Sequence, residues 1–579
     1  MKKKTRGIHF LLLVSAIFLT GCVTTNLPEY YTVNPEVLEA KGGRVTFTID
    51  GTFPAKSFHK KAVVEFSPYL KFGDERIELK KLILKGEKAE GEGTIINSKT
   101  GGSFAYSDEF LYTHNMRASE LYVDAKIRKG SKISEYNNIK LADGVIHTYQ
   151  DIIHDEELIY APSGYEPITI VSENATLYFR VNSADLNMNL ALNKDEEAIA
   201  KMKELEDFLM KGWDVKDIKI NAWASPEGEI HFNDNLATKR ADAASKFMKS
   251  KLTGINKKRA KALGVDVSSL EKEVAYSASG NGEDWDGFMT AIKNSDLKDK
   301  NQILNVVNSQ SDVTKREEEI RNMTVIYKEI EETILPPLRR AEITVNCFEP
   351  KRTDEEMAEL VMTNPDELTY AEIMHTATLT DDPTARYNIY QTAFTNKDRD
   401  WKAYNNAAAE AIVLNKLNEA GNLLIQAEKL AKDNGKIENN LGVLACHENN
   451  YEAAEQYFMK AMSHGENENY NLGVVSIQKG DYAKALNYFK GIDCKHNVAL
   501  AQVLSGNMND GLKNLKCSPE SAQTNYLLAV YGARSNNADM VYEYLAKAIN
   551  KDASMKAKAK EDREFLKLFD EHAFAQLVN

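Results

Sequence analysis

The spacing of hydrophobic and polar residues changes twice along the chain and divides it into three regions. In the first, over residues 42–147, short runs alternate apolar and polar positions, as in Val45, Phe47 and Ile49. Glycine-containing turns separate these runs about every ten residues. Alternation with period two buries one face of each strand, so the pattern predicts an antiparallel β-sandwich over residues 42–165.

In the second region strands and helices alternate, which predicts a small α/β domain over residues 166–348. The expected strands are 176–181, 215–222, 274–278 and 340–347. A helix after Asn193 and another from about Asp234 are expected to pack on the sheet. Their expected buried positions are Ile199, Met202, Leu205 and Leu209 in the first helix, and Leu236, Ala244, Phe247 and Met248 in the second.

The third region is helical. A charged linker is expected over residues 349–367, and Thr369 with Glu372 has the spacing of a capping box that opens a helix. Small residues then recur with an offset of 34 residues from Ala408 to Gly442 and of 31 from Gly442 to Gly473.

Each of these small residues has a second one 12 residues later, at Ala420, Ala454 and Ala485. This period resembles the tetratricopeptide repeat, whose helices cross closely at two such positions. The resemblance implies an all-α solenoid over residues 368–579, with five or six helix pairs and a concave face that binds a peptide or a partner protein.

The N-terminus has the form of a secretory signal peptide over residues 1–21, with a basic start and an apolar run from Phe10 to Leu19. A membrane-spanning helix needs about 20 apolar residues, so this run is too short for one. The ending Leu19-Thr20-Gly21-Cys22 resembles the bacterial lipobox, which implies acylation of Cys22 and a tether over residues 22–41. Val23 takes the place of the aspartate that favours inner-membrane retention, so an outer-membrane, periplasm-facing lipoprotein is expected.

Composition narrows the possible functions. The net charge of −13 argues against nucleic acid as a partner, because phosphate binding needs a basic surface. The other four cysteines, Cys347, Cys446, Cys494 and Cys517, have no CxxC spacing and are expected in the core. A disulfide between Cys494 and Cys517 stays open, since an oxidising periplasm permits it.

Catalytic chemistry finds little support in the sequence. There is no GxSxG, HExxH or P-loop motif, so the chain is not expected to be an enzyme or to need a cofactor. His147, His154 and Asp155 have a poor spacing for metal ligands. Solvated or interdomain histidines are the favoured interpretation, and no metal site is predicted.

One arginine stands out in the α/β region. Asn233 and Arg240 are seven residues apart, about two helical turns, so both face the loop from Ser225 to Gly228. A guanidinium beside a helix start offers a fork of donors that suits a carboxylate. The alternative is that Arg240 only pairs with a local carboxylate and supports the fold.

The spacing of Gly228, Asn233, Leu236-Ala237 and Arg240-Ala241 resembles the OmpA-like family, and residues 335–343 resemble its closing strand. The resemblance covers roughly residues 170–348. It implies non-covalent peptidoglycan binding, in which Arg240 takes a carboxylate of the stem-peptide diaminopimelate and Asn233 shapes the loop.

The sequence departs from that family in two places. Ser225 stands where the family has an aspartate, a variant that resembles OmpA-family lipoproteins of Bacteroides-like bacteria. Because serine lacks the charge, wall binding should be weaker unless Glu227 compensates. An insertion at about 281–334 separates the last two strands, and it either covers the site or builds a partner surface.

Two functions follow from these expectations. The leading one is a tether that joins the outer membrane to peptidoglycan through the OmpA-like domain and recruits an envelope protein through the helical repeats. The alternative is a scaffold subunit of an outer-membrane protein complex that does not bind the wall, and the missing aspartate favours it.

Overall fold

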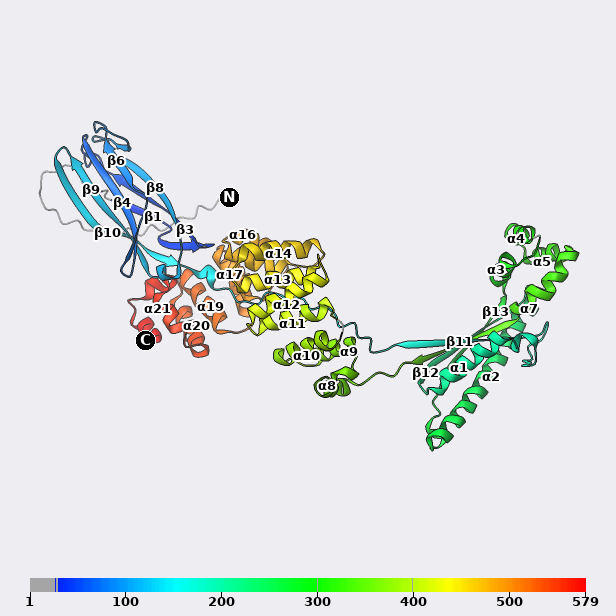
Figure 1. The fold of residues 1–579 in the computed structure, drawn as a ribbon. Helices are drawn as coiled ribbons and strands as arrows, with labels where there is room; N and C mark the ends of the chain where they lie inside the picture. The colour runs from blue at the N-terminus through cyan, green and yellow to red at the C-terminus, as the bar shows by residue number, and fades with distance from the viewer. Residues whose placement is uncertain (1–26, 28–29, 299, 398) are drawn as a thin grey trace. The chain divides into compact units, whose positions relative to one another are not determined.

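The chain forms two compact units in a computed structural model that describes residues 27, 30–298, 300–397 and 399–579. Unit 1 comprises the described residues up to Ser163 together with Pro365–Asn579, and unit 2 is Gly164–Asn364. Unit 2 is thus inserted in the sequence between two parts of unit 1 (Figure 1). The expected signal peptide and Cys22 lie outside the described residues.

The first part of unit 1 is a β-domain of ten strands. The strands are β1 Tyr30–Asn34, β2 Val37–Lys41, β3 Arg44–Phe53, β4 Ala62–Phe72, β5 Glu75–Glu78, β6 Leu82–Gly86, β7 Thr94–Ile96, β8 Gly102–Leu111, β9 Ser119–Lys129 and β10 Lys132–Ile146. Short 3-10 turns follow β8 (η1, His114–Met116) and β10 (η2, Thr148–Gln150). Burial alternates along the long strands, as the period-two pattern predicts.

The β-domain differs from the predicted sandwich in two respects. Its strands form one continuous sheet in the order β1-β3-β2-β10-β9-β4-β6-β7, with β8 added on β3 and β5 on β4. The sheet is continuous because β2 pairs antiparallel with β3 and parallel with β10. In addition, β1 and β2 lie within residues 22–41, so the expected tether contains two strands of the sheet.

The second part of unit 1 is helical. Its helices are α9 Tyr370–Thr376, α10 Pro383–Asn396, α11 Trp401–Val413, α12 Leu417–Leu430, α13 Gly435–His447, α14 Tyr451–Ser463, α15 Asn469–Gln478, α16 Tyr482–Tyr488, α17 His496–Leu504, α18 Met508–Cys517, α19 Ala522–Arg534, α20 Ala538–Lys551, α21 Met555–Glu561 and α22 His572–Val578. Short turns are η6 Pro365–Glu367, η7 Ala377–Leu379 and η8 Arg563–Leu568. The Thr369–Glu372 capping box is confirmed.

Helices α11 to α20 pack as five successive pairs, which confirms the predicted repeat of helix pairs (Figure 1). The small residues lie where the helices of a pair meet. A Cβ on Gly442 would come within 2.5 Å of the Phe458 ring, and one on Gly473 within 2.2 Å of the Phe489 ring. Larger residues at these positions would push the pairs apart.

The four cysteines in the described residues form one disulfide and two buried free thiols. Cys494 and Cys517 form a disulfide that joins the segment before α17 to the end of α18. Cys347 and Cys446 are buried and free, as expected of core residues.

The β-domain and the helices share one apolar core. Leu38, Val45 and Leu121 of the sheet belong to the same buried cluster as Tyr470 and Val474 of α15. Polar contacts add to it: Arg534 of α19 pairs with Glu39 of β2 at 2.7 Å. Because burial of apolar surface is the main source of stability, unit 1 behaves as one folded body.

Unit 2 is an α/β domain with an added helical cluster. Its strands are β11 Ile170–Tyr178, β12 Asp214–Ala224, β13 Ala275–Glu283 and β14 Arg340–Phe348, and its helices are α1 Glu196–Met210, α2 Ile230–Leu263, α3 Trp285–Asn294, α4 Lys300–Ser309, α5 Val313–Asn322, α6 Thr324–Glu329, α7 Leu335–Leu338 and α8 Asp354–Thr363. Short 3-10 turns η3 (Ala191–Asn193) and η4 (Val267–Ser269) and the π-helical turn η5 (Ile330–Ile334) complete it.

The sheet of unit 2 has the order β11-β14-β12-β13, with β12 and β13 parallel and β14 antiparallel to its neighbours. Helices α1 and α2 cover one face, where they pack on Leu177, Ile220 and Ile343. The insertion folds into α3 to α7 around a core of its own. The α/β architecture with a helical insertion is therefore as predicted.

Two local expectations about the helices on the sheet were wrong. Ile199 is 52% exposed, because α1 buries Met202, Leu205 and Leu209 along a narrower stripe. Helix α2 begins at Ile230 rather than near Asp234.

The expected linker at 349–367 contains helix α8, which Thr353 and Glu356 open with a capping box. Within the described residues, no helix combines the length and the apolar character that crossing a membrane requires.

Candidate functional site: an asparagine ladder and a buried arginine

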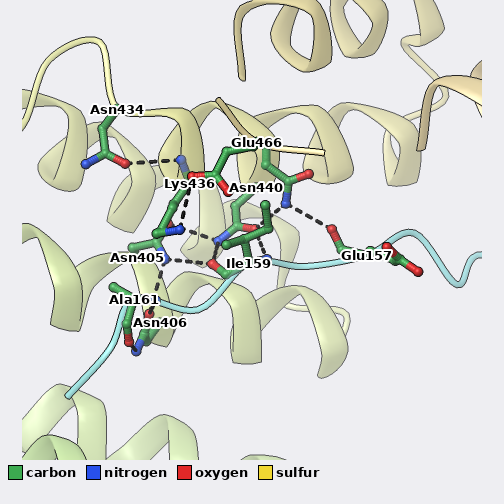
Figure 2. Close-up of polar contacts among 10 residues, drawn as sticks. Glu157, Ile159, Ala161, Asn405, Asn406, Asn434, Lys436, Asn440 and Glu466 are labelled. Carbon is green, nitrogen blue, oxygen red and sulfur yellow. Dashed lines mark hydrogen bonds and ion pairs between the residues drawn. The ribbon is translucent and has the colours of Figure 1, made fainter. Parts of the chain in front are cut away.

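An extended segment of the chain lies along the first helices of the repeat pairs. This segment, Asp151–Ala161, follows η2 and is here called the strap. It contacts a set of asparagines, here called the asparagine ladder, which comprises Asn405 and Asn406 of α11, Asn439 and Asn440 of α13, Asn471 of α15 and Asn497 of α17. Figure 2 shows part of it, with Asn405, Asn406 and Asn440 beside Ile159 and Ala161 of the strap. Every ladder residue is 2% exposed or less.

The ladder binds the strap through its backbone. Asn406 accepts a hydrogen bond from the Ala161 N–H (2.7 Å), and its amide donates to the Ala161 carbonyl (2.9 Å). Asn440 makes the same pair of bonds with Ile159, at 2.9 and 3.0 Å. The pattern recurs between Asn471 and Glu157 (2.7 and 3.1 Å) and between Asn497 and Ile153 (2.9 and 2.7 Å). Alternate strap residues are thus held as they would be by a neighbouring β-strand.

The asparagines also bond to one another. Asn405 donates to Asn406 (3.1 Å), and Asn440 donates to Asn405 (3.0 Å). Asn439 donates to Asn440 (3.0 Å), and Asn471 donates to Asn439 (2.9 Å). A buried network in which each amide is satisfied rigidifies a structure, whereas an unpaired amide there would cost stability.

The ladder follows the repeat that the sequence shows. Asn406, Asn440 and Asn471 stand 34 and 31 residues apart, and each lies directly before an Ala-Ala or Leu-Gly pair used to align the repeats. Asparagine is unfavourable in helix interiors and rarely fully buried. Its recurrence at a core position was the signal that sequence reasoning missed.

Two titratable side chains, His496 and Glu468, lie at the edges of this site. The His496 Nε2 lies 2.8 Å from the Asp151 carbonyl, at the start of the strap. Glu468, fully buried beside Asn471, accepts a hydrogen bond from the Asn471 amide (3.3 Å). Burial raises the pKa of the Glu468 carboxyl to about 7. The ladder mainly binds backbone, and one side chain of the strap joins it, because Asn497 also donates to the Asp155 carboxylate (2.9 Å).

The strap changes the interpretation of the helical repeats. Their inner surface was expected to hold a peptide or a partner protein. The chain's own strap occupies the face of the first helices from α11 to α17, so another extended chain could bind there only by displacing it.

Arg240, the predicted ligand-binding residue, points into unit 2 and is 1% exposed. Its Nε donates to the Ser183 carbonyl (3.1 Å), and its two terminal nitrogens donate to the carbonyls of Trp223 (2.9 Å) and Arg180 (2.9 Å). Burial, followed by the charge of Arg339, lowers the pKa of Arg240 to about 10. The guanidinium that was predicted to bind a ligand carboxylate therefore donates to backbone carbonyls of its own domain.

The other predicted site residues lie together, Ser225 and Glu227 in the loop before α2 and Asn233 in its first turn. Ser225 donates to Glu227 at 2.5 Å, and Glu227 pairs with Arg339 at 2.8 Å. Asn233, 2% exposed, donates to the Glu227 carbonyl (3.0 Å) and to Glu283 (2.8 Å). Glu227 is thus committed to Arg339, an arginine that sequence reasoning did not single out.

The insertion helix α5 and the loop before α2 enclose a hollow of about 430 Å³. Glu229, Glu317, Glu318, His231 and Arg321 are among its lining residues. Burial, followed by the charge of Glu283, raises the pKa of Glu317 to about 7. The insertion therefore covers this loop and gives the hollow a largely acidic wall.

Comparison with protein-family models gives no match for this chain, and comparison with curated proteins gives none either. Among solved structures, a tetratricopeptide repeat protein from Parabacteroides merdae ATCC 43184 is 15% identical with a TM-score of 0.30, over 37% of this chain and 91% of that chain.

PilF from Pseudomonas aeruginosa is 15% identical with a TM-score of 0.28, over 37% and 99% of the two chains. YrrB, described as a tetratricopeptide repeat protein with an unusual peptide-binding site, is 17% identical with a TM-score of 0.20, over 36% and 100%. These similarities are too distant to assign a function. The evidence for the helical repeats is the packing of the helix pairs in this chain.

Proposed function

We propose that this protein is a non-enzymatic scaffold of the bacterial outer membrane, lipid-anchored at Cys22 and facing the periplasm. Its β-domain and helical repeats would act as one rigid body that positions envelope proteins. The observation that carries the proposal is the strap, which fastens the two parts of unit 1 along several helix pairs. The lipobox at residues 19–22 supports the anchor.

A rigid body of this kind suits a structural role. The shared apolar core and the strap both resist relative motion of the β-domain and the helices. Unit 2 is joined to this body by two chain connections, one after Ser163 and one before Pro365. A protein partner would then bind surfaces other than the face that the strap covers.

Peptidoglycan binding through unit 2 is the second candidate function. The OmpA-like spacing of Gly228, Asn233 and Arg240 favours it, and so does the hollow beside that loop. The three backbone bonds of Arg240 argue against the predicted role of its guanidinium, because a stem-peptide carboxylate would have to replace them. Wall binding thus stays a prediction, and the scaffold is the better supported function.

Fractionation of cells tests the anchor and the scaffold together. Wild type should appear in the outer membrane, and the Cys22→Ala variant should lose the membrane fraction, whereas Thr24→Ala should keep it. Cross-linking in intact cells should give one stoichiometric complex with another envelope protein. A monomeric wild-type protein in the membrane would contradict the scaffold proposal.

Sedimentation of the full mature chain with isolated sacculi decides between the two candidates. The scaffold proposal predicts that wild type stays in the supernatant. If wild type instead sediments, and Arg240→Lys lowers the bound fraction while the exposed neighbour Lys239→Ala does not, peptidoglycan tethering is the correct function.

A further inference from the structure

Three side chains with the chemistry of metal ligands meet where the strap crosses α13. His154 and Glu156 come from the strap, and His447 is the last residue of α13. One ligand atom from each lies within 4.8 Å of the others. Among the described residues, this is the one group of three or more histidine, cysteine and carboxylate side chains that is close enough together to hold a metal ion.

The carboxylate of this group is buried and incompletely paired. The side chain of Glu156 is 0% exposed, and its Oε1 lies 3.3 Å from the His154 Nδ1. Its Oε2 has no partner at hydrogen-bond geometry within the part of the chain that the structure describes, and the buried Cys446 thiol, a weak donor, is its neighbour. A buried carboxylate oxygen without a partner is costly, so a cation at this point would satisfy a group that the fold leaves unsatisfied.

The two imidazoles are placed as ligands rather than as a hydrogen-bonded pair. The ring centroids of His154 and His447 are 5.0 Å apart. The His154 side chain is 38% exposed, so solvent reaches the group from one side. By contrast, His464 and Glu438 form a simple pair at 2.6 Å, and no third ligand joins them within the described residues.

We propose that His154, Glu156 and His447 bind a divalent transition-metal ion of the zinc class. Zinc takes imidazole nitrogens at about 2.0–2.1 Å and carboxylate oxygens at about 2.0–2.2 Å, which sets ligand atoms roughly 3.3–3.5 Å apart in a tetrahedron. The His154–Glu156 separation of 3.3 Å already has this value. His447 closes the site by a small side-chain rotation at the end of its helix, and water takes the fourth position.

A metal ion here would act as a clamp on the strap. The group lies between two contacts of the asparagine ladder, Ile153 with Asn497 and Glu157 with Asn471. Its ligands belong to two segments far apart in the sequence, so the ion would join the strap to α13 directly. Binding to the folded state alone stabilises it in proportion to ligand concentration.

The test uses the full mature chain, stripped with a chelator and titrated with zinc chloride by calorimetry. One equivalent should bind, and zinc should slow proteolysis of the strap. His154→Ala, His447→Ala and Glu156→Gln should each weaken binding by about tenfold or more. His464→Ala removes a histidine with its own glutamate partner and should bind zinc like wild type.

X-ray absorption of the zinc-loaded wild type supplies a measurement that does not depend on how the variants fold. Two imidazoles with oxygen ligands would support the site. Sulfur ligands, or oxygen ligands alone, would overturn it. The proposal also fails if wild type shows no saturable zinc binding, or if the His154→Ala/His447→Ala double variant binds zinc as wild type does.

Discussion

The asparagine ladder and the Arg240 guanidinium both bind the chain's own backbone, but in different ways. The ladder uses neutral amides that pair with both the N–H and the C=O of alternate strap residues. Arg240 uses one positive charge that three carbonyls share. The first arrangement imitates a β-strand, and the second is a fixed support inside a domain.

The difference shows which site can exchange its occupant. An amide ladder recognises features that every extended chain carries, so a second segment could in principle take the place of the strap. The bonds of Arg240 are made to the carbonyls of Arg180 and Ser183, which follow β11, and of Trp223 in β12, and removing them would leave a buried cation unpaired. A functional residue type in a suitable pattern is therefore no proof of an open site.

The largest effect is expected for Arg240→Ala. Its loss removes the donor of three backbone carbonyls and a large buried side chain, and should lower the unfolding free energy of unit 2 by about 3–5 kcal/mol. Urea unfolding followed by tryptophan fluorescence measures this, because three of the four tryptophans, Trp213, Trp223 and Trp285, lie in unit 2. Lys239→Ala is the matched control, since Lys239 is exposed on the same helix. A loss below about 1 kcal/mol would mean that the arginine is not a support.

Asn440→Ala should have the next largest effect. It removes both bonds to Ile159 and two bonds within the ladder, which predicts a loss of about 2–4 kcal/mol from unit 1. Limited proteolysis should cut the strap faster in this variant. The exposed Asn469→Ala on α15 controls for loss of an asparagine. Equal stability and equal cleavage of the two variants would show that the ladder does not hold the strap.

The third prediction concerns Glu468, the buried carboxyl beside the neutral asparagine ladder, and the way in which it makes the stability of unit 1 depend on pH. Burial raises the pKa of Glu468 from 4.5 to about 7, so the folded state holds a proton that the unfolded state has released. Stability is thus fully present below pH 4.5 and falls as pH rises through about 7, by about 1–3 kcal/mol in total.

Thermal unfolding at pH 5 and pH 8 measures this change. Glu468→Gln stays neutral and should lose less stability between the two pH values than wild type. The exposed Glu452→Gln should behave as wild type does. A wild-type Tm that does not fall from pH 5 to pH 8 relative to Glu468→Gln would contradict the raised pKa.

The smallest effect is expected for a backbone substitution in the strap. Ile159→Pro removes the N–H that donates a hydrogen bond to Asn440. The unfolding free energy of unit 1 should fall by about 1–2 kcal/mol. Leu158→Pro places proline at an alternate position of the same extended segment and should cost less. Urea unfolding compares the two. If both prolines destabilise equally, the alternation of contacts along the strap is not what holds it.

Local signals in the sequence predicted much of the fold. The capping box at Thr369 and the closing strand from Arg340 were found because each depends on residues a few positions apart, and the glycines at 442 and 473 were found because they recur with the period of the repeat. The start of the β-domain, the helix within residues 349–367 and the outward position of Ile199 were not. These depend on pairing and packing between distant segments.

The candidate sites were predicted less well for the same reason. Asn233 and Arg240 do share a side of α2, as their spacing indicated. The spacing could not show that Arg240 donates to backbone carbonyls of the domain instead of facing an open loop. The strap could not be found from its own sequence, because the ladder binds its backbone N–H and C=O groups, which every residue type other than proline carries. His154 was considered as a ligand with His147 and Asp155, whereas the structure brings it to Glu156 and His447.

The order of synthesis gives the strap a further consequence. Ala161 is made 245 residues before Asn406, and all of unit 2 is made between them. The segment that is made first therefore has no asparagines to pair with until the helices that carry them have been made. The β-domain must wait for the C-terminal half of the chain before unit 1 can close, and a truncated polypeptide would leave the segment bare.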